Sequence, residues 1–294
     1  MLLLHTRTFQ LRGFEGRDIP KYAILSHTWG DDEILFQDLS EPQSPTWRQK
    51  QAFGKVAGSC RKASDHGYDW IWIDTCCIDK SSSAELSEAI NSMFRYYKDS
   101  AECYVYMADL EPGRKLHSGN RWFTRGWTLQ ELIAPSDVRF YNSSWGYIGN
   151  KLCLSEDLAF ITVPIQDVLA STSTARIMSW ASKRETKKEE DIAYSLIGLF
   201  DVNIPLLYGE GSKAFIRLQH EIVRKRKDQS ILAWRNPLVQ LPPYRDFWNN
   251  SREISPLAPS PGMETAAPST TSTGATVRSP IMSCFVRILR RRWR

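Results

Sequence analysis

The sequence predicts an α/β fold, in which a mostly parallel β-sheet is flanked by helices and followed by an additional helical layer. Three observations predict it. Short apolar runs rich in β-branched and aromatic residues recur along the first half of the chain, and segments with helical periodicity fill the gaps between them. The second half carries helical patterns with little strand signal. Strands that alternate with helices indicate parallel pairing through right-handed crossovers.

The four apolar runs are each four or five residues long, which is typical of strands. They are residues 22–25, 70–73, 103–107 and 138–141. The first three are almost continuously apolar, as expected for strands that are covered on both faces.

Helices are predicted between these runs. Apolar residues share one face of a segment from about Trp47 to His66, and of a second from about Ser83 to Lys98, ahead of which Ser81 to Ser83 offer an N-cap. A third, shorter helix is expected from about Thr124 to Ile133, where Pro135 stops it.

The second half divides into a helical part and a tail. Three helical patterns lie between about Ala175 and Trp234. We expect residues 1–174 to form the α/β domain and residues 175–235 to pack on it as a helical layer. The charged run 183–191 is interpreted as a solvated helix start. Residues 255–280 contain five Pro and ten Ser or Thr, so residues 236–294 are expected to be a disordered tail.

The net charge of the chain, +5, resides in this tail, because residues 236–294 contain eight Arg and three acidic residues. The remaining residues balance to zero, which argues against nucleic acid as a partner. The stretch 285–294 has five Arg and several apolar residues. It is expected either to be a disordered basic end or to make weak contact with an anionic membrane surface as an amphipathic helix.

Targeting signals are not evident in the sequence. No run reaches about 18 apolar residues, the length that a membrane span needs, and Met1 to Leu4 are too short an apolar run for a secretion signal. The six Cys lack regular spacing and are typical of reduced thiols. We therefore expect a cytoplasmic protein.

Polar side chains gather where the predicted strands end. Open α/β sheets bind ligands beyond the carboxyl ends of their strands. The third helix adds Trp127 and Glu131, one helical turn apart. The residues expected to line a pocket at this edge are Trp29, Asp74, Asp79, Trp127 and Glu131.

Several familiar sites are absent from the sequence. It has no Gly-x-Gly-x-x-Gly after the first strand, no Walker loop, no Gly-x-Ser-x-Gly elbow and no paired Cys-x-x-Cys or His-Glu-x-x-His. These absences disfavour a common dehydrogenase, nucleoside triphosphatase or serine hydrolase, and they predict no bound metal.

Two further patterns leave alternatives open. Cys76 and Cys77 could form a nucleophilic site with His27, although cysteines at a strand end more often serve packing. The aromatic and basic residues of 121–127 could stack on nucleic-acid bases, although aromatic packing at a helix entry suits the neutral surroundings better.

Four long motifs, in order, resemble the fungal heterokaryon-incompatibility (HET) domain and the sequence that commonly follows it. They are Tyr-Ala-Ile-Leu-Ser-His-Thr-Trp-Gly at 22–30, the segment 70–80, the segment 121–135, and the stretch from 179 to 211. The resemblance covers roughly residues 1–235. It implies a role in fungal non-self recognition, in which an incompatible fusion triggers programmed cell death.

The HET domain is also similar to the Toll/interleukin-1 receptor (TIR) domain of innate immunity, which implies a flavodoxin-like sheet. Enzymatic TIR domains cleave NAD with a Glu in a Trp-Cys-x-x-Glu-Leu segment. Residues 127–132 match it except that Thr128 replaces Cys. The resemblance thus implies that Glu131 is catalytic, with NAD as a substrate and no resident cofactor.

Cleavage of the nicotinamide–ribose bond passes through a sugar that gains positive charge, which one carboxylate can stabilise. In this hypothesis Trp29 or Trp127 stacks on a ring, and Arg121 or Arg125 meets the diphosphate. The residues expected to bind the dinucleotide are Ser26, His27, Trp29, Asp74, Asp79, Arg121, Arg125 and Trp127.

The resemblance also implies that copies of the chain associate into a homo-oligomer on activation, together with an incompatibility partner protein that the sequence does not identify. The alternative is a non-catalytic signalling module that self-associates or docks a partner.

Overall fold

A computed structural model describes residues 1–40, 45–161, 169 and 171–232 of the chain. The chain divides into two units, Met1–Ile231 and Leu232–Arg294, and the first is described below. The tail predicted for residues 236–294, with its basic end, lies outside the described residues. None of the described helices is long and apolar enough to cross a membrane.

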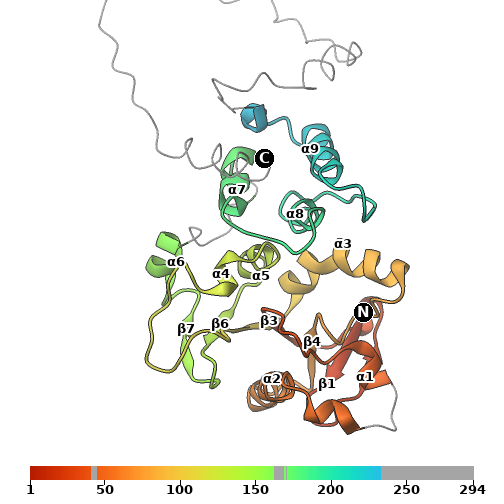
Figure 1. The fold of residues 1–294 in the computed structure, drawn as a ribbon, viewed down its shortest axis with the longest axis vertical. Coiled ribbons are helices and arrows are strands. Elements are labelled where there is room, and N and C mark those ends of the chain that lie inside the picture. The colour runs from red at the N-terminus through yellow and green to blue at the C-terminus, as the bar shows by residue number, and fades with distance from the viewer. Residues whose placement is uncertain (41–44, 162–168, 170, 233–294) are drawn as a thin grey trace, which may run out of the picture. The chain divides into compact units, whose positions relative to one another are not determined.

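One sheet of seven strands forms the centre of the described part (Figure 1). Its spatial order is β2-β1-β4-β3-β5-β6-β7. The strands are β1 (Leu2–His5), β2 (Leu11–Gly13), β3 (Ala23–His27), β4 (Trp70–Ile73), β5 (Glu102–Tyr106), β6 (Val138–Tyr141) and β7 (Tyr147–Asn150). The four in the middle, β4, β3, β5 and β6, are parallel, whereas β1, β2 and β7 pair antiparallel.

The predicted α/β architecture with a mostly parallel sheet is therefore confirmed. The four apolar runs are the four parallel strands, and β3 is buried along its whole length. The sequence did not predict β1, β2 and β7. Two of them are four residues long, the third has three, and both β2 and β7 contain a Gly.

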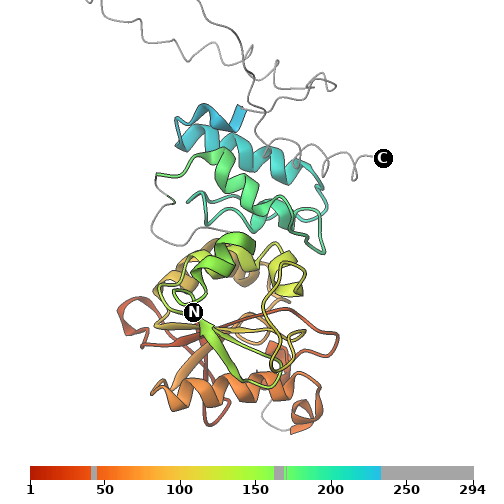
Figure 2. The same ribbon diagram turned by 90° about the vertical axis from the view of Figure 1, so that its left-hand side faces the viewer.

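Helices cover both faces of the sheet. Helix α2 (Phe53–Asp65) lies on one face, and α3 (Ser83–Asp99), α4 (Arg121–Thr124) and α5 (Thr128–Ile133) lie on the other, as Figures 1 and 2 show. A short helix, α1 (Phe36–Ser40), follows the end of β3. The side chain of Ser82 accepts a hydrogen bond from the Glu85 N–H, so the predicted N-cap of α3 is present.

Two predicted helices differ from the structure. The helix expected from Trp47 begins only at Phe53, because Trp47 belongs to a separate 3-10 helix, Pro45–Gln49, and packs its ring 5.6 Å from that of Phe53. The helix expected over 124–133 begins only at Thr128, and Thr124 instead ends a separate short helix, α4. Arg125 is extended, with φ −82° and ψ 138°, and it separates α4 from α5.

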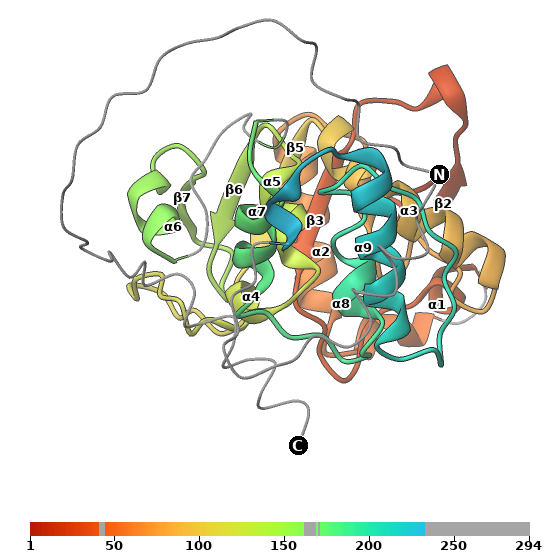
Figure 3. The same ribbon diagram turned by 90° about the horizontal axis from the view of Figure 1, so that it is seen from above.

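The helical layer follows α6 (Ser155–Ile161) and consists of α7 (Thr174–Ala181), α8 (Asp191–Tyr194), α9 (Lys213–Lys225) and a 3-10 helix, Gln229–Leu232 (Figure 3). It packs on α3: a Cβ on Gly198 would lie 2.2 Å from the Cβ of Phe94. The sheet and this layer belong to the same unit. A boundary between them at residue 174 stays a prediction.

The interpretation of residues 183–191 as a solvated run is wrong for two of them. Arg184 and Glu190 are buried, at 8% and 7% exposed. The carboxylate of Glu190 accepts hydrogen bonds from the N–H groups of Gly209 and Gly211. Both Gly209 and Gly211 have positive φ, which glycine adopts without strain.

Candidate functional site

The candidate site lies at the carboxyl ends of the parallel strands. Counted in chain order, these strands stand side by side as 2-1-3-4. The connection that leaves β4 crosses β3 and returns to β5 on its other side. This reversal is the point at which open α/β sheets bind ligands. The candidate site therefore lies around the carboxyl end of β3.

Glu131 lies beneath this edge, in α5, with only 5% of its surface exposed. Ser26, next to last in β3, donates its hydroxyl hydrogen to Oε2 of Glu131 at 2.5 Å. The indole N–H of Trp122 in turn donates to the Ser26 hydroxyl at 2.8 Å. A strand, α4 and α5 thus meet in one buried chain of hydrogen bonds.

Burial, together with the nearby Asp74 carboxylate, raises the pKa of Glu131 to about 8. Hydrogen bonds from Ser26 and Tyr97, and the charge of Arg184, oppose the rise. At neutral pH the carboxyl is therefore mostly protonated. The anion that the sequence predicts at this position dominates only above about pH 8.

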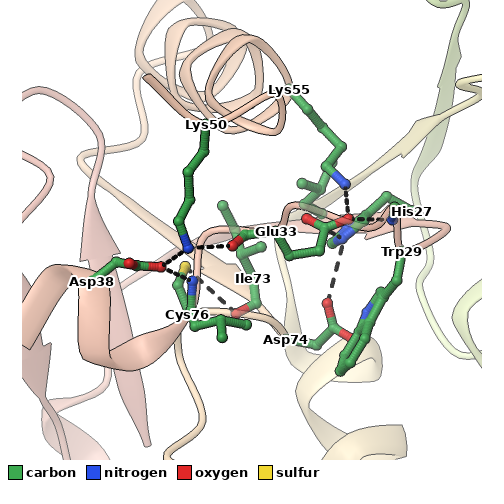
Figure 4. A network of polar contacts seen from close by, with 12 residues as sticks. His27, Trp29, Glu33, Asp38, Lys50, Lys55, Ile73, Asp74 and Cys76 are labelled. Atoms are coloured by element: carbon green, nitrogen blue, oxygen red, sulfur yellow. Dashed lines mark hydrogen bonds and ion pairs between the residues drawn. The ribbon is translucent and has the colours of Figure 1, made fainter. Parts of the chain in front are cut away.

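A second group of polar side chains lies on the α2 side of the same edge and is drawn in Figure 4. His27, the last residue of β3, has its Nε2 3.8 Å from Oε2 of Glu33 and its Nδ1 3.8 Å from Oδ1 of Asp74. Lys55 of α2 donates to Oε1 of Glu33 at 2.5 Å. The indole N–H of Trp29 donates to Oδ2 of Asp74 at 2.7 Å. The side chains of successive strand residues point to opposite faces of the sheet. Ser26 therefore belongs to the group around Glu131, and His27 belongs to the group around Glu33 and Asp74.

The imidazole of His27 is neutral in this surrounding. Burial lowers its pKa well below the usual value, and Lys55 and Lys80 lower it further. Neither ring nitrogen makes a hydrogen bond within the described part of the chain. Burial raises the pKa of Asp74, against the opposing effects of Lys80 and the Trp29 indole.

One face of the Trp29 ring is covered by Lys80. The ammonium nitrogen of Lys80 lies 3.7 Å from the centre of the Trp29 ring system, an attractive cation–π contact. A ligand that stacks on this face must displace Lys80.

Three other predicted residues have further partners. Asp79 accepts hydrogen bonds from the N–H and hydroxyl of Ser81, which lower its pKa. The exposed Arg121 donates to the Trp29 carbonyl at 3.2 Å. Trp127 makes a side-chain hydrogen bond to Asp191 of α8, so its partner differs from that of Glu131.

The structure thus pairs Ser26 with Glu131, and it groups His27 with Trp29 and Asp74. Sequence reasoning missed Glu33, Lys55 and Arg184. Glu33 ends a run of three acidic residues that looks solvated, and Lys55 interrupts an apolar helix face. The interruption of that face was the one available signal.

Four of the six cysteines have the properties of packing residues. Cys60, Cys76, Cys77 and Cys103 are buried thiols. Burial raises the pKa of Cys60 to about 12. The hydrogen bond with Cys77 and burial raise the pKa of Cys76 well above its usual value. A thiol held in its protonated form is a poor nucleophile, so the packing interpretation is the one supported. Among the described residues, no group of three or more His, Cys, Asp or Glu side chains could hold a metal ion.

Two family models match the sequence. Residues 22–119 match the family described as heterokaryon incompatibility protein (HET), and residues 213–271 match a domain of unknown function (DUF8212). The first match ends before the helix that carries Glu131. The second begins at α9 and continues into residues outside the described part.

The chain is also similar to a curated protein, vegetative incompatibility protein HET-E-1 of Podospora anserina. The two are 43% identical over 233 residues, which cover 73% of this chain but 17% of that protein. The chain therefore corresponds to a small part of that relative. No solved structure matches it significantly.

Proposed function

Because the chain carries a fungal heterokaryon-incompatibility (HET) domain, we propose that it acts in non-self recognition, as an effector of the programmed cell death that follows an incompatible fusion. The support is the name of its relative, a vegetative incompatibility protein. The matched region is only 17% of that protein, so the proposal concerns the role of the shared region alone.

The order of the parallel strands supports the finer proposal that the domain is TIR-like. The order 2-1-3-4 is that of the first four strands of flavodoxin-like sheets. In such sheets the ligand lies across the end of the first strand, which here is β3.

The chemistry proposed for this edge is hydrolysis of NAD at the nicotinamide–ribose bond, with Glu131 as the catalytic residue. The observation that supports it is the position of this carboxyl, bonded to Ser26 at the end of the central strand. Nicotinamide leaves a pyridinium as a neutral molecule, so no general acid is needed. An anion beside the ribose stabilises the positive charge that grows on the sugar.

Bound NAD would itself favour the ionised form of Glu131. A pyridinium ring beside Glu131 carries a positive charge, and a nearby opposite charge lowers the pKa of a carboxyl. The protonated Glu131 of the free chain would therefore lose its proton as NAD binds.

The burial of Glu131 bears on both candidate functions. Only 5% of this residue is exposed, so hydrolysis requires that the edge of the sheet opens to admit NAD. We propose that this opening accompanies clustering of several copies. In the alternative, the edge stays closed, Glu131 is structural, and the domain is a non-catalytic self-associating module.

The first prediction concerns turnover. The full chain, fused to a coiled coil that forces several copies together, is incubated with NAD, and released nicotinamide is measured. We expect release by the wild type and a loss of at least about 100-fold in Glu131→Gln, because removal of one charge-stabilising group commonly costs that much.

The matched control is Glu102→Gln. Glu102 is also buried, at 8% exposed, but it lies at the amino end of β5 and pairs with Arg139. We expect this variant, if folded, to keep its activity. Equal release by wild type and Glu131→Gln would contradict the role of Glu131, and no release by any clustered chain would support the non-catalytic module.

A further inference from the structure

A segment of the helical layer, residues 184–186, holds the turn between α4 and α5. The N–H of Gly126 donates to the Glu185 carbonyl at 2.9 Å, and the N–H of Glu185 donates to the Thr124 carbonyl at 2.6 Å. The two stretches form a short parallel bridge. A Cβ on Gly126 would lie 2.5 Å from Cγ2 of Thr186, so the contact leaves no space for a side chain at Gly126.

Arg184 strengthens this contact from within. Its guanidinium donates through Nη1 to the Arg125 carbonyl at 2.8 Å and to the Thr128 hydroxyl oxygen at 2.8 Å. Thr128 is the first residue of α5. A planar guanidinium holds its donors in fixed directions, so these two bonds fix where α5 begins.

Arg184 and Glu131 also influence each other through their charges. Burial lowers the pKa of Arg184 to about 9, and Glu131 opposes that change. Arg184 in turn opposes the rise in the pKa of Glu131. A charge buried without a compensating partner is costly, so ionised Glu131 and Arg184 would partly compensate each other once the carboxyl loses its proton.

We infer that Arg184 is a positioning residue for Glu131: its two hydrogen bonds fix the first turn of the helix that carries this carboxyl, and they hold its positive charge about one helical turn from Glu131. The functional meaning of this inference rests on the proposed role of Glu131. The coupling between the two side chains can be measured without any turnover.

The test follows the titration of Glu131 in the full chain by NMR of ¹³C-labelled Glu carboxyl groups, with its signal identified by its absence in Glu131→Gln. We expect Arg184→Gln to move the midpoint to higher pH. Arg184→Lys keeps the charge but loses the fork of donors, so we expect a smaller shift. The control is Arg176→Gln, which removes an exposed Arg of the same layer and should leave the midpoint unchanged.

An unchanged midpoint in folded Arg184→Gln would overturn the inference. If that variant does not fold, Arg184→Lys takes its place, because it keeps the charge and leaves the Thr128 hydroxyl with its own bonds to the Trp122 and Arg125 carbonyls. We then expect faster amide hydrogen exchange in α5 and a higher midpoint, and wild-type values for both would overturn the inference. A chain that shows the coupling but never releases nicotinamide would contradict the proposed activity alone.

Discussion

Glu131 keeps its proton in the folded chain up to about pH 8, whereas an unfolded chain loses it near pH 4.3. Between these values the folded state binds more protons than the unfolded state. The contribution of this group to the free energy of unfolding therefore falls as the pH rises through that window. A buried carboxyl of this kind costs stability at neutral pH, which is common where chemistry needs a perturbed group.

A second prediction follows for stability. Glu131→Gln replaces the protonated acid with a neutral side chain of similar shape, so its stability relative to the wild type should improve as the pH rises from about 5 to about 8. Urea denaturation at both pH values measures the difference between the two proteins. A difference independent of pH would mean that Glu131 titrates normally in the folded chain.

The sequence predicted some residues of the site and not others, for a physical reason. Ser26, His27 and Asp74 could be placed because they stand at or directly after the carboxyl end of a strand, and parallel strands end at one edge. Arg184 could not be placed, since it stands in a charged run, and its burial depends on a turn more than 50 positions earlier in the chain. Contacts of that kind leave no local pattern.

At the level of elements, the same limit applies to α4 and α5. The sequence predicts one helix from about Thr124 to Ile133, which would run through Arg125. The break arises from the backbone bridge to residues 184–186, a tertiary contact that overrides local preference. By contrast, α3 has an N-cap and a long apolar face of its own, and both of its ends were predicted to within one residue.

A third prediction concerns the packing of α3 against the helical layer. An added methyl group in Gly198→Ala would meet the Phe94 side chain at 2.2 Å. We expect a loss of about 1–3 kcal/mol in the free energy of unfolding, the usual cost of overpacking. Thermal and urea denaturation measure it.

The control for this variant is Gly54→Ala. Gly54 lies in α2, and a Cβ there would meet nothing within 4 Å. Because Ala favours a helix more than Gly does, this change should be neutral or stabilising. If both variants behaved alike, α3 and the layer would not pack as described.

At the level of the whole molecule, the helical layer belongs with the sheet in one unit, Met1–Ile231. The layer covers Phe94 and supplies Arg184, so the α/β part alone would expose an apolar surface and lose the contact that fixes α5. The HET family match, at residues 22–119, is therefore shorter than this unit.

A fourth prediction tests this dependence by truncation. We expect residues 1–231 to unfold in one cooperative transition, as small single units do. Residues 1–174 should unfold at a markedly lower temperature or aggregate. Calorimetry on both fragments decides the matter, and equal transition temperatures would mean that the helical layer is dispensable for folding.

The outer strands of the sheet limit how copies of this chain can associate. Within the described residues, β2 at one border has three residues and β7 at the other has four. Such short borders offer few unpaired backbone groups for strand addition, which protects a protein against amyloid-like growth. Association of copies through these borders would therefore have to rest on contacts between side chains rather than on a continuous sheet.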